Sequence, residues 1–352
     1  MKLSCFAREL HSRRAFRIAR PRIGTLCNVF VKLESEGITG LGEASPNAFY
    51  NETAEGVSAR LASAAPFFSS LKIRTVTDIG EVWAKLWPLV APSRAAQCAL
   101  DIALWDWLAQ REGVSATQLA WGIAAKPVNT FCTIGLSTPD ELAEKVEELR
   151  GFPLIKIKSD QHADLTPVRA ARQLSPNSRV AVDANCGWSS VEMGQHDSIN
   201  RLVALAVELK EIGVEFIEQP FPPEQDARLP RLASGPPLFA DESCVTEDYI
   251  DRMALAGFSG FNIKLDKCGG ITPALRMARH GHALGLKTMV GCMLESSLLI
   301  AAGAVVAQQT DYADLDGAWL LGDDPFQGWR FNRGTLSPPI GTGLGVEPAT
   351  NP

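Results

Sequence analysis

Two lysines stand two positions apart in the segment LIKIKSD, residues 154–160. The β-branched neighbours Ile155 and Ile157 predict a largely buried strand. Because side chains on a strand alternate between its faces, Lys156 and Lys158 point the same way. Two ammonium groups on one buried face are costly unless opposite charges lie nearby. An edge strand with both lysines in water is the simpler interpretation, so chemistry is indicated only if the chain supplies partner charges.

Those charges follow three later apolar segments, which end in VDAN, IEQP and ADES. One acid at a strand end is more often a helix N-cap, but Asp183, Glu218 and Asp241 in succession predict one buried cluster. Buried carboxylates raise each other's pKa unless a cation neutralises them. Oxygen ligands without His or Cys select a hard cation such as Mg²⁺. We therefore expect these acids to bind one Mg²⁺ per subunit, with Mn²⁺ able to replace it.

Lys264, in GFNIKLD, gives the first lysine pair a counterpart on the other side of this cluster. A lysine is a base only when neutral, and loss of water, a nearby cation and the charge of Lys156 all lower its pKa. We predict that Lys158 and Lys264 are catalytic bases and that Lys156 orients a substrate carboxylate. Mg²⁺ on that carboxylate would stabilise the enediolate formed when the adjacent carbon loses its proton. Two bases on opposite faces allow 1,1-proton transfer with inversion of that carbon.

Eight apolar segments must position these residues, beginning at residues 130, 154, 179, 215, 238, 260, 287 and 312. Their starts are 22 to 36 residues apart, which leaves room for one strand, one helix and two short loops. This rhythm predicts an α/β fold, a (β/α)7β-type TIM barrel in which the C-terminal strand ends meet in one pocket. An open doubly wound sheet is the alternative, but no GxGxxG follows the first strand.

The chain before the barrel has strands first and helices afterwards, which indicates an α+β capping domain. The segment NVFVKLESEGITGLGEAS predicts two strands joined by a turn at Glu36–Gly37, and residues 93–113 predict a helix. The Gly- and Pro-rich end of the chain should pack back onto this domain and complete it. The predicted boundaries are 1–120 for the cap, 121–322 for the barrel and 323–352 for the C-terminal segment.

The composition of the 352 residues, with 46% hydrophobic and 21% charged, is that of a globular protein. A net charge of −6 gives no electrostatic reason to bind nucleic acid or an anionic membrane. Eight scattered cysteines suit a reduced compartment. The arginines among residues 8–22 lead directly into a strand, so they belong to the folded domain more readily than to a transit peptide. We expect a cytoplasmic homo-oligomer.

At the motifs KxK, DAN, EQP, ADES and NIKLDKCGG, together with GLGEASPNAFYNET and ALDIALWDWLA, the sequence resembles the enolase superfamily, specifically its muconate-lactonizing-enzyme subgroup. Lys264 stands where the mandelate-racemase subgroup carries a His–Asp dyad. Within the subgroup, GCMLES and DLDG resemble dipeptide epimerases. The resemblance implies that Asp316, helped by Asp314, binds the α-ammonium of a dipeptide and that Thr133, Lys156 and Cys292 contact the substrate. Asn185 and Glu295, at the third and seventh strand ends, are expected to support the site.

One departure concerns the arginine that glutamate-preferring members carry in a loop after FxIA. The loop here reads IARPRIG, so Pro21 or Ile23 stands at that position, between Arg20 and Arg22. Either arginine could replace the missing one, and the sequence leaves the preferred side chains open.

Three rival interpretations remain. Muconate cycloisomerase, o-succinylbenzoate synthase and N-succinylamino-acid racemase share the lysines and metal ligands but need no ammonium-binding DxD. A barrel aldolase would form a Schiff base at Lys264 without a metal. A binding protein without activity would be expected to lose some catalytic residues, whereas every position is filled here. For the DLDG segment alone, a helix N-cap is the alternative.

Overall fold

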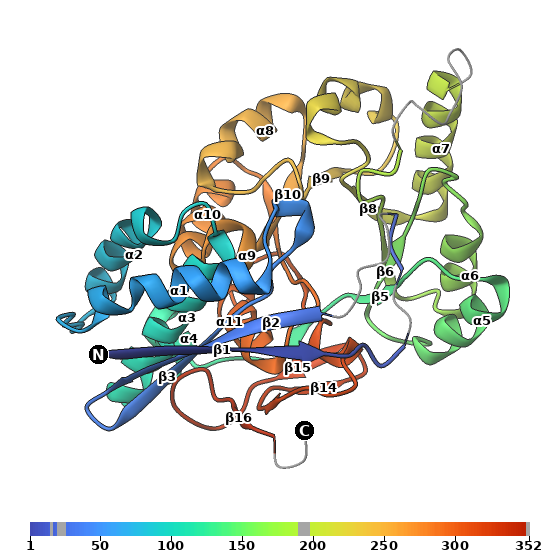
Figure 1. Ribbon diagram of the computed structural model, residues 1–352. Helices are drawn as coiled ribbons and strands as arrows, with labels where there is room; N and C mark the ends of the chain where they lie inside the picture. Colours follow the sequence, from blue (N-terminus) through green and yellow to red (C-terminus); the bar gives the residue numbers. More distant parts are fainter. Residues whose placement is uncertain (15–16, 20–25, 189–197, 350–352) are drawn as a thin grey trace.

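Residues 1–14, 17–19, 26–188 and 198–349 are described in the computed structural model of this chain (Figure 1). A small antiparallel sheet and its helices, from the N-terminal third of the chain, lie beside a ring of parallel strands surrounded by helices. Within the described ranges, no helix has the length and apolar character needed to cross a membrane. The cytoplasmic location and the homo-oligomer stay predictions.

The cap contains a three-stranded antiparallel sheet in the order β1 (Lys2–Leu10), β2 (Leu26–Ser35) and β3 (Ile38–Ala44). The predicted hairpin of β2 and β3 is confirmed. Its turn residues Glu36 and Gly37 have φ angles of 54° and 74°, in the left-handed region that such tight turns require. The edge strand β1 was not predicted, because KLSCFAREL mixes polar and apolar residues with no buried face of its own.

Four helices complete the cap: α1 (Ala54–Phe68), α2 (Val76–Val90), α3 (Arg94–Arg111) and α4 (Ala116–Trp121). The predicted helix at 93–113 is confirmed as α3, and the Ser93 side chain caps it by accepting from the Ala96 amide at 3.0 Å. Gly42 lets β3 approach α3 closely, since a Cβ there would lie 1.9 Å from the Ala99 carbonyl oxygen. The sheet therefore rests directly on the helix backbone.

All eight predicted barrel strands are present and parallel. They are β5 (Cys132–Ile134), β6 (Leu154–Lys158), β7 (Arg179–Asp183), β8 (Val214–Glu218), β9 (Leu238–Ala240), β10 (Gly260–Lys264), β11 (Lys287–Gly291) and β12 (Tyr312–Asp314). Each strand pairs with the next in chain order. The ring closes between β12 and β5, where the Phe131 amide donates to the Ala313 carbonyl oxygen at 2.8 Å.

The connections are mostly helical, as predicted. They contain α5 (Pro139–Glu148), α6 (Thr166–Leu174), α7 (Ser198–Ile212), α8 (Ile250–Ala256), α9 (Leu265–Cys268), α10 (Ile271–Ala283) and α11 (Ser297–Ala307). Between β8 and β9 the chain forms a 3₁₀ segment, Pro223–Leu232, instead of an α-helix. Pro230 lies within that segment, and proline disfavours the interior of an α-helix.

The two ends of the barrel interior differ in polarity. Near the N-terminal strand ends, an apolar plug fills the ring: Phe131, Leu154, Ala181, Phe216, Phe239 and Met289, with Tyr312 packed against them. The rings of Phe216 and Phe239 stack with centroids 4.2 Å apart. Solvent cannot enter from this side, so the charged residues farther along the strands can be reached only from the opposite end.

The C-terminal segment contains β13 (Phe326–Gln327), β14 (Arg330–Asn332), β15 (Thr335–Ser337) and β16 (Glu347–Pro348). It returns to the cap, as predicted, where the Phe326 ring lies 5.5 Å from that of Phe30 and the Leu344 amide donates to Asp106 Oδ1 at 2.8 Å. It also touches the barrel connection, because β15 pairs with β4 (Val128–Asn129). The exact domain boundaries stay predictions.

Candidate active site

The residues that the sequence predicted for the site are brought together at the C-terminal ends of the strands. All are buried except the half-buried Cys292. Each of the eight strands, or the residues just after it, contributes at least one of them: Thr133 on β5, Lys156 and Lys158 on β6, Asp183 and Asn185 at β7, Glu218 on β8, Asp241 after β9, Lys264 on β10, Cys292 and Glu295 after β11, and Asp314 and Asp316 at β12.

Two lysines hold the carboxylate cluster from opposite sides. Lys158 Nζ lies 2.6 Å from Asp183 Oδ2, and Lys264 Nζ lies 3.0 Å from Asp241 Oδ2. Their strands, β6 and β10, are separated in the ring by β7, β8 and β9. The carboxylates therefore lie between two ammonium groups, as the sequence predicted.

Lys156 lies deeper, among three carboxylates. Its Nζ contacts Asp314 and lies 3.4 Å from Glu218 Oε2 and 3.6 Å from Asp183 Oδ2. Burial alone would lower the pKa of Lys156, but these carboxylates outweigh burial and raise it well above its usual range. Lys156 is therefore held as an ammonium ion among these carboxylates, which fits an orienting group.

The three central carboxyl groups differ in protonation. Burial raises the pKa of Asp183 and of Asp241, but the adjacent lysines more than offset burial and lower both values. For Glu218, burial followed by the charge of Asp183 raises the pKa to about 7. Glu218 therefore holds a proton more readily than Asp183 or Asp241, and additional positive charge would favour its ionised form.

The donor chemistry of this cluster fits a hard divalent cation. Asp183 and Glu218 are paired neighbours on β7 and β8, Asp241 follows the next strand, and all three offer only oxygen. Asn185 Oδ1 is a further buried oxygen, without a hydrogen-bond partner among the described residues. However, no three His, Cys, Asp or Glu side chains in the described ranges are already arranged to hold a metal. The lysine ammonium groups occupy the carboxylate oxygens that a cation would need.

A second acidic pair lies at the seam between β12 and β5. The Thr133 amide donates to Asp316 Oδ2 at 2.7 Å, so a side chain takes the place of a backbone acceptor across the seam. Burial, followed by the charge of Asp314, raises the pKa of Asp316 to about 6. Asp314 Oδ1 is buried and has no hydrogen-bond partner among the described residues. This pair is suited to receive a cationic group.

Cys292 and Glu295 follow β11. Loss of contact with water, followed by the charge of Glu295, raises the pKa of the Cys292 thiol well above its usual range. The thiol is therefore neutral and can contact a substrate, but it is not an activated nucleophile. Burial raises the pKa of Glu295 to about 8 even though its Oε1 accepts from the Met293 amide at 2.6 Å.

Several residues of the site were missed at the sequence level. Asn262 Nδ2 donates to Glu218 Oε1 at 2.7 Å, and Gln219 Oε1 accepts from the Asp241 amide at 2.8 Å. Lys267 Nζ lies 2.6 Å from Asp241 Oδ1. Asn262 could have been found, because it stands two residues before Lys264 and so faces the same side of β10. Lys267 lies in the recognised NIKLDKCGG motif, but nothing in the sequence distinguishes it from a surface lysine.

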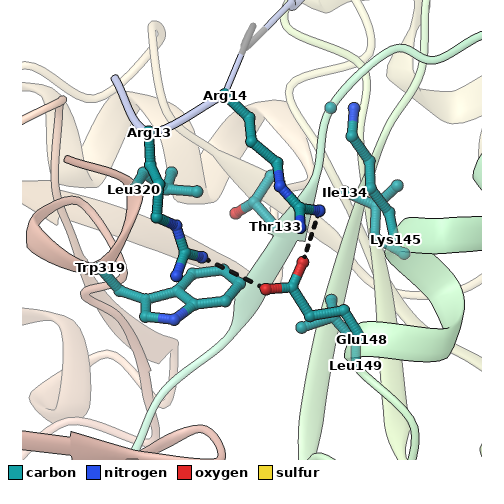
Figure 2. Close-up of a pocket in the computed structure, with 10 residues that line it drawn as sticks. Arg13, Arg14, Thr133, Ile134, Lys145, Glu148, Leu149, Trp319 and Leu320 are labelled. Carbon is teal, nitrogen blue, oxygen red and sulfur yellow. Dashed lines mark hydrogen bonds and ion pairs between the residues drawn. The ribbon is translucent and has the colours of Figure 1, made fainter. Parts of the chain in front are cut away.

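A small cavity lies beside the seam and not at the carboxylate cluster (Figure 2). Its volume is about 40 Å³, and Thr133 is the predicted site residue in its lining. Glu148 bridges Arg13 and Arg14 at 3.3 and 2.9 Å, as the dashed lines in Figure 2 mark. The Arg13 guanidinium also lies 4.5 Å from the ring centre of Trp319. These arginines belong to the folded chain, as predicted. The loop positions Arg20, Pro21, Arg22 and Ile23 lie outside the described residues.

Comparison with known proteins identifies the family. Residues 2–120 match the N-terminal domain of mandelate racemase / muconate lactonizing enzyme, and residues 140–351 match the enolase C-terminal domain-like family. An L-Ala-D/L-amino acid epimerase from Flavobacterium johnsoniae is 36% identical over 356 residues, which cover 98% of this chain and 99% of the relative.

Two solved structures are similar over almost their whole length. One is an enolase family member from Agrobacterium tumefaciens with homology to dipeptide epimerases, with bound sodium and L-Ala-L-Glu. It is 34% identical with a TM-score of 0.83, covering 96% of this chain and 97% of its own. The other is a dipeptide epimerase from Methylococcus capsulatus complexed with Mg and L-Arg-D-Lys. It is 31% identical with a TM-score of 0.84, and 98% of each chain is covered. The chain described here belongs to the mandelate racemase / muconate lactonizing enzyme family of the enolase superfamily.

Proposed function

We propose that this chain is a metal-dependent dipeptide epimerase that inverts the α-carbon of the C-terminal residue by two-base 1,1-proton transfer. One observation carries the proposal: Lys158 and Lys264 approach a single carboxylate cluster from opposite sides. The acidic pair Asp314 and Asp316 lies across the barrel from that cluster and suits the free amino end of a peptide. The names of the relatives point to the same reaction class.

We assign the metal to Asp183, Glu218 and Asp241, with Mg²⁺ as the cation found with one similar dipeptide epimerase. The bound cation would supply positive charge beside the substrate carboxylate, where negative charge develops as the α-proton leaves. Asn185 would support it with its buried Oδ1. Mn²⁺ is expected to replace Mg²⁺, because it accepts the same oxygen ligands.

Both bases must lose their carboxylate partners before they can accept a proton. The attraction of Asp241 outweighs burial and raises the pKa of Lys264, so the paired lysine is held as an ammonium ion. When Asp241 turns toward a cation, Lys264 loses this stabilisation, and burial together with the charge of Lys156 then favours its neutral amine. One lysine removes the α-proton while the other, still protonated, returns a proton to the opposite face.

The acidic pair at the seam would orient the substrate. A dipeptide ammonium between Asp314 and Asp316 gives the buried Asp314 Oδ1 a donor that the described residues do not supply. Thr133 keeps Asp316 in place through its backbone amide. The half-buried Cys292 and the fixed cation Lys156 are assigned to contact the substrate, and Glu295 supports the loop after β11 through the Met293 amide.

The proposal leaves the side chains of the dipeptide open. One similar structure contains L-Ala-L-Glu and another contains L-Arg-D-Lys, so side-chain preference varies among proteins of this fold. Arg20 or Arg22 would favour an acidic C-terminal residue if either reaches the site. Muconate cycloisomerase, o-succinylbenzoate synthase and N-succinylamino-acid racemase remain the alternatives that use the same lysines, but their substrates would offer no ammonium group to Asp314 and Asp316.

The test is an assay of L,L-dipeptides with the Mg²⁺-loaded protein in D₂O, read by mass spectrometry and chiral separation. We expect some dipeptides to gain one deuteron and to form the epimer at the C-terminal residue. A variant with both Lys158→Ala and Lys264→Ala is the control and should give neither change. Turnover of muconate or succinylated substrates, with no dipeptide exchanged, would contradict the proposal.

A further inference from the structure

Asp241 is held by two lysines whose surroundings are different. Lys264 Nζ contacts Oδ2 at 3.0 Å, whereas Lys267 Nζ contacts Oδ1 at 2.6 Å. The Lys264 side chain is 9% exposed and the Lys267 side chain is fully buried. The two oxygens of this one carboxylate therefore have separate cationic partners.

The ammonium of Lys267 is fixed by the backbone as well. It donates to the carbonyl oxygens of Asp241 at 2.6 Å, Cys244 at 3.1 Å and Asn262 at 3.0 Å. These carbonyls belong to the end of β10 and to the turn after β9, so one side chain ties two neighbouring strand ends together. For Lys264 Nζ, the hydrogen bond in the described structure is the single one to Asp241. Lys264 can move away from Asp241 with the loss of one hydrogen bond. Lys267 would lose its hydrogen bonds to three carbonyl oxygens as well.

We infer that Lys267 is a positioning residue, which holds Asp241 Oδ1 permanently so that only Oδ2 is available to the metal. This inference rests on the proposed function, because it assigns Asp241 as a metal ligand. Lys264 and the metal then share Oδ2 in turn, while Lys267 never leaves. The arrangement explains why Lys264 can act as a base although a second lysine lies even closer to the same carboxylate.

Removal of Lys267 should change the Mg²⁺ affinity in opposite directions for a positioning role and for a purely electrostatic role. A lysine that only repels the incoming cation lowers metal affinity, so its removal should tighten Mg²⁺ binding. A lysine that holds the ligand in its binding orientation does the opposite. Loss of such an outer partner typically weakens metal binding by about 10–100-fold.

The experiment measures Mg²⁺ binding in the absence of substrate, by isothermal titration calorimetry and by the Mg²⁺-induced rise in melting temperature. Lys267→Met removes the charge at nearly constant volume, and Lys267→Gln keeps a donor without the charge. We expect about 10–100-fold weaker binding for Lys267→Met and a smaller loss for Lys267→Gln. The matched control is Lys264→Met, which should bind Mg²⁺ at least as tightly as the parent because a competitor for Oδ2 is gone, although epimerisation is lost.

Two results would overturn the inference. One is unchanged or tighter Mg²⁺ binding in the Lys267 variants. The other is a loss of Mg²⁺ binding in Lys264→Met as large as in Asp241→Asn, since Lys267 would then not suffice to hold the ligand. The second result decides the question even if the buried Lys267 variants do not fold. Failure of the parent protein to bind Mg²⁺ at all would instead contradict the proposed function, so the two failures can be told apart.

Discussion

The backbone amide of Thr133 donates to Asp316 Oδ2 at 2.7 Å, across the seam where β5 and β12 close the barrel. One oxygen of this carboxylate is thereby fixed by the protein backbone. Because burial and Asp314 raise the pKa of Asp316 to about 6, a cationic ligand would gain from entering here and would stabilise the ionised form.

Asp316→Asn should therefore weaken recognition of the dipeptide ammonium while the fold is kept, since the amide oxygen can still accept from Thr133. A charge-assisted hydrogen bond contributes about 1.5–3 kcal/mol, so kcat/KM for dipeptides should fall roughly 10- to 150-fold. Steady-state kinetics with a free and an N-acetylated dipeptide would check this. The parent should prefer the free dipeptide and the variant should lose that preference, with Mg²⁺ affinity unchanged. Equal preference in both proteins would speak against an ammonium site.

Removal of the divalent cation should abolish turnover. Asp183→Asn and Glu218→Gln each remove one charged oxygen ligand without changing side-chain size, and we expect activity to fall by several orders of magnitude, because metal affinity and charge stabilisation are both lost. Activity and Mg²⁺ binding should be measured side by side, with circular dichroism to confirm folding. Full activity in protein treated with EDTA would contradict the metal assignment and would support a Schiff base at Lys264.

The fold could be predicted from the sequence because its spacing is regular. Eight apolar segments, each followed by room for one helix, define the barrel without reference to any side-chain contact. The polar residues of the site follow from the same pattern, because they stand where the apolar segments end. Strand β1 was not predicted because one of its faces is exposed and the other only half-buried, and the alternation breaks at Phe6 and Ala7, which are both exposed. The 3₁₀ conformation of Pro223–Leu232 was not predicted, because the length of this connection is also that of an α-helix.

The partners of the site residues could not be predicted in the same way. That Lys158 pairs with Asp183, and Lys264 with Asp241, depends on the register between neighbouring strands, which spacing along the chain does not fix. Lys267 is the clearest case. Its role depends on three backbone carbonyls that come together only when β9 and β10 lie side by side.

A pH dependence of stability is expected from Asp101, which lies on α3 where the cap meets the barrel. Burial raises the pKa of Asp101 to about 7, although the Thr272 amide and hydroxyl donate to its carboxylate at 2.9 and 2.6 Å. The folded state therefore holds the proton more tightly than the unfolded chain does. The free energy of unfolding should fall as the pH rises from about 4 to about 7 and then level off.

Asp101→Asn isolates this contribution, because the neutral amide cannot ionise. Relative to the parent, the variant should gain roughly 2–3 kcal/mol between pH 5 and pH 8. Urea unfolding of both proteins at several pH values gives this difference and cancels other titrating groups. A difference in unfolding free energy that does not change with pH would show that Asp101 is already ionised at pH 5 in the folded state.

The two bases give the sharpest test of the reaction itself. Lys158 and Lys264 approach from strands on opposite sides of the carboxylates, so each can reach the α-hydrogen of only one configuration. With either lysine replaced by Ala, epimerisation should stop, because one of the two proton transfers is missing. The remaining lysine should still exchange the α-hydrogen of its own diastereomer with solvent deuterium.

The two variants should consequently show opposite preferences when each is incubated with both diastereomers in D₂O and analysed by proton NMR. The preference is diagnostic and the rate is not, since removing one positive charge changes the electrostatics of the pocket and slows exchange in both variants. If both variants exchange the same diastereomer, a single base serves both faces and the two-base assignment is wrong. If the parent instead releases a dehydrated or cyclised product, the lysines catalyse an elimination or a cycloisomerisation. In that case both the dipeptide substrate and the two-base mechanism are wrong.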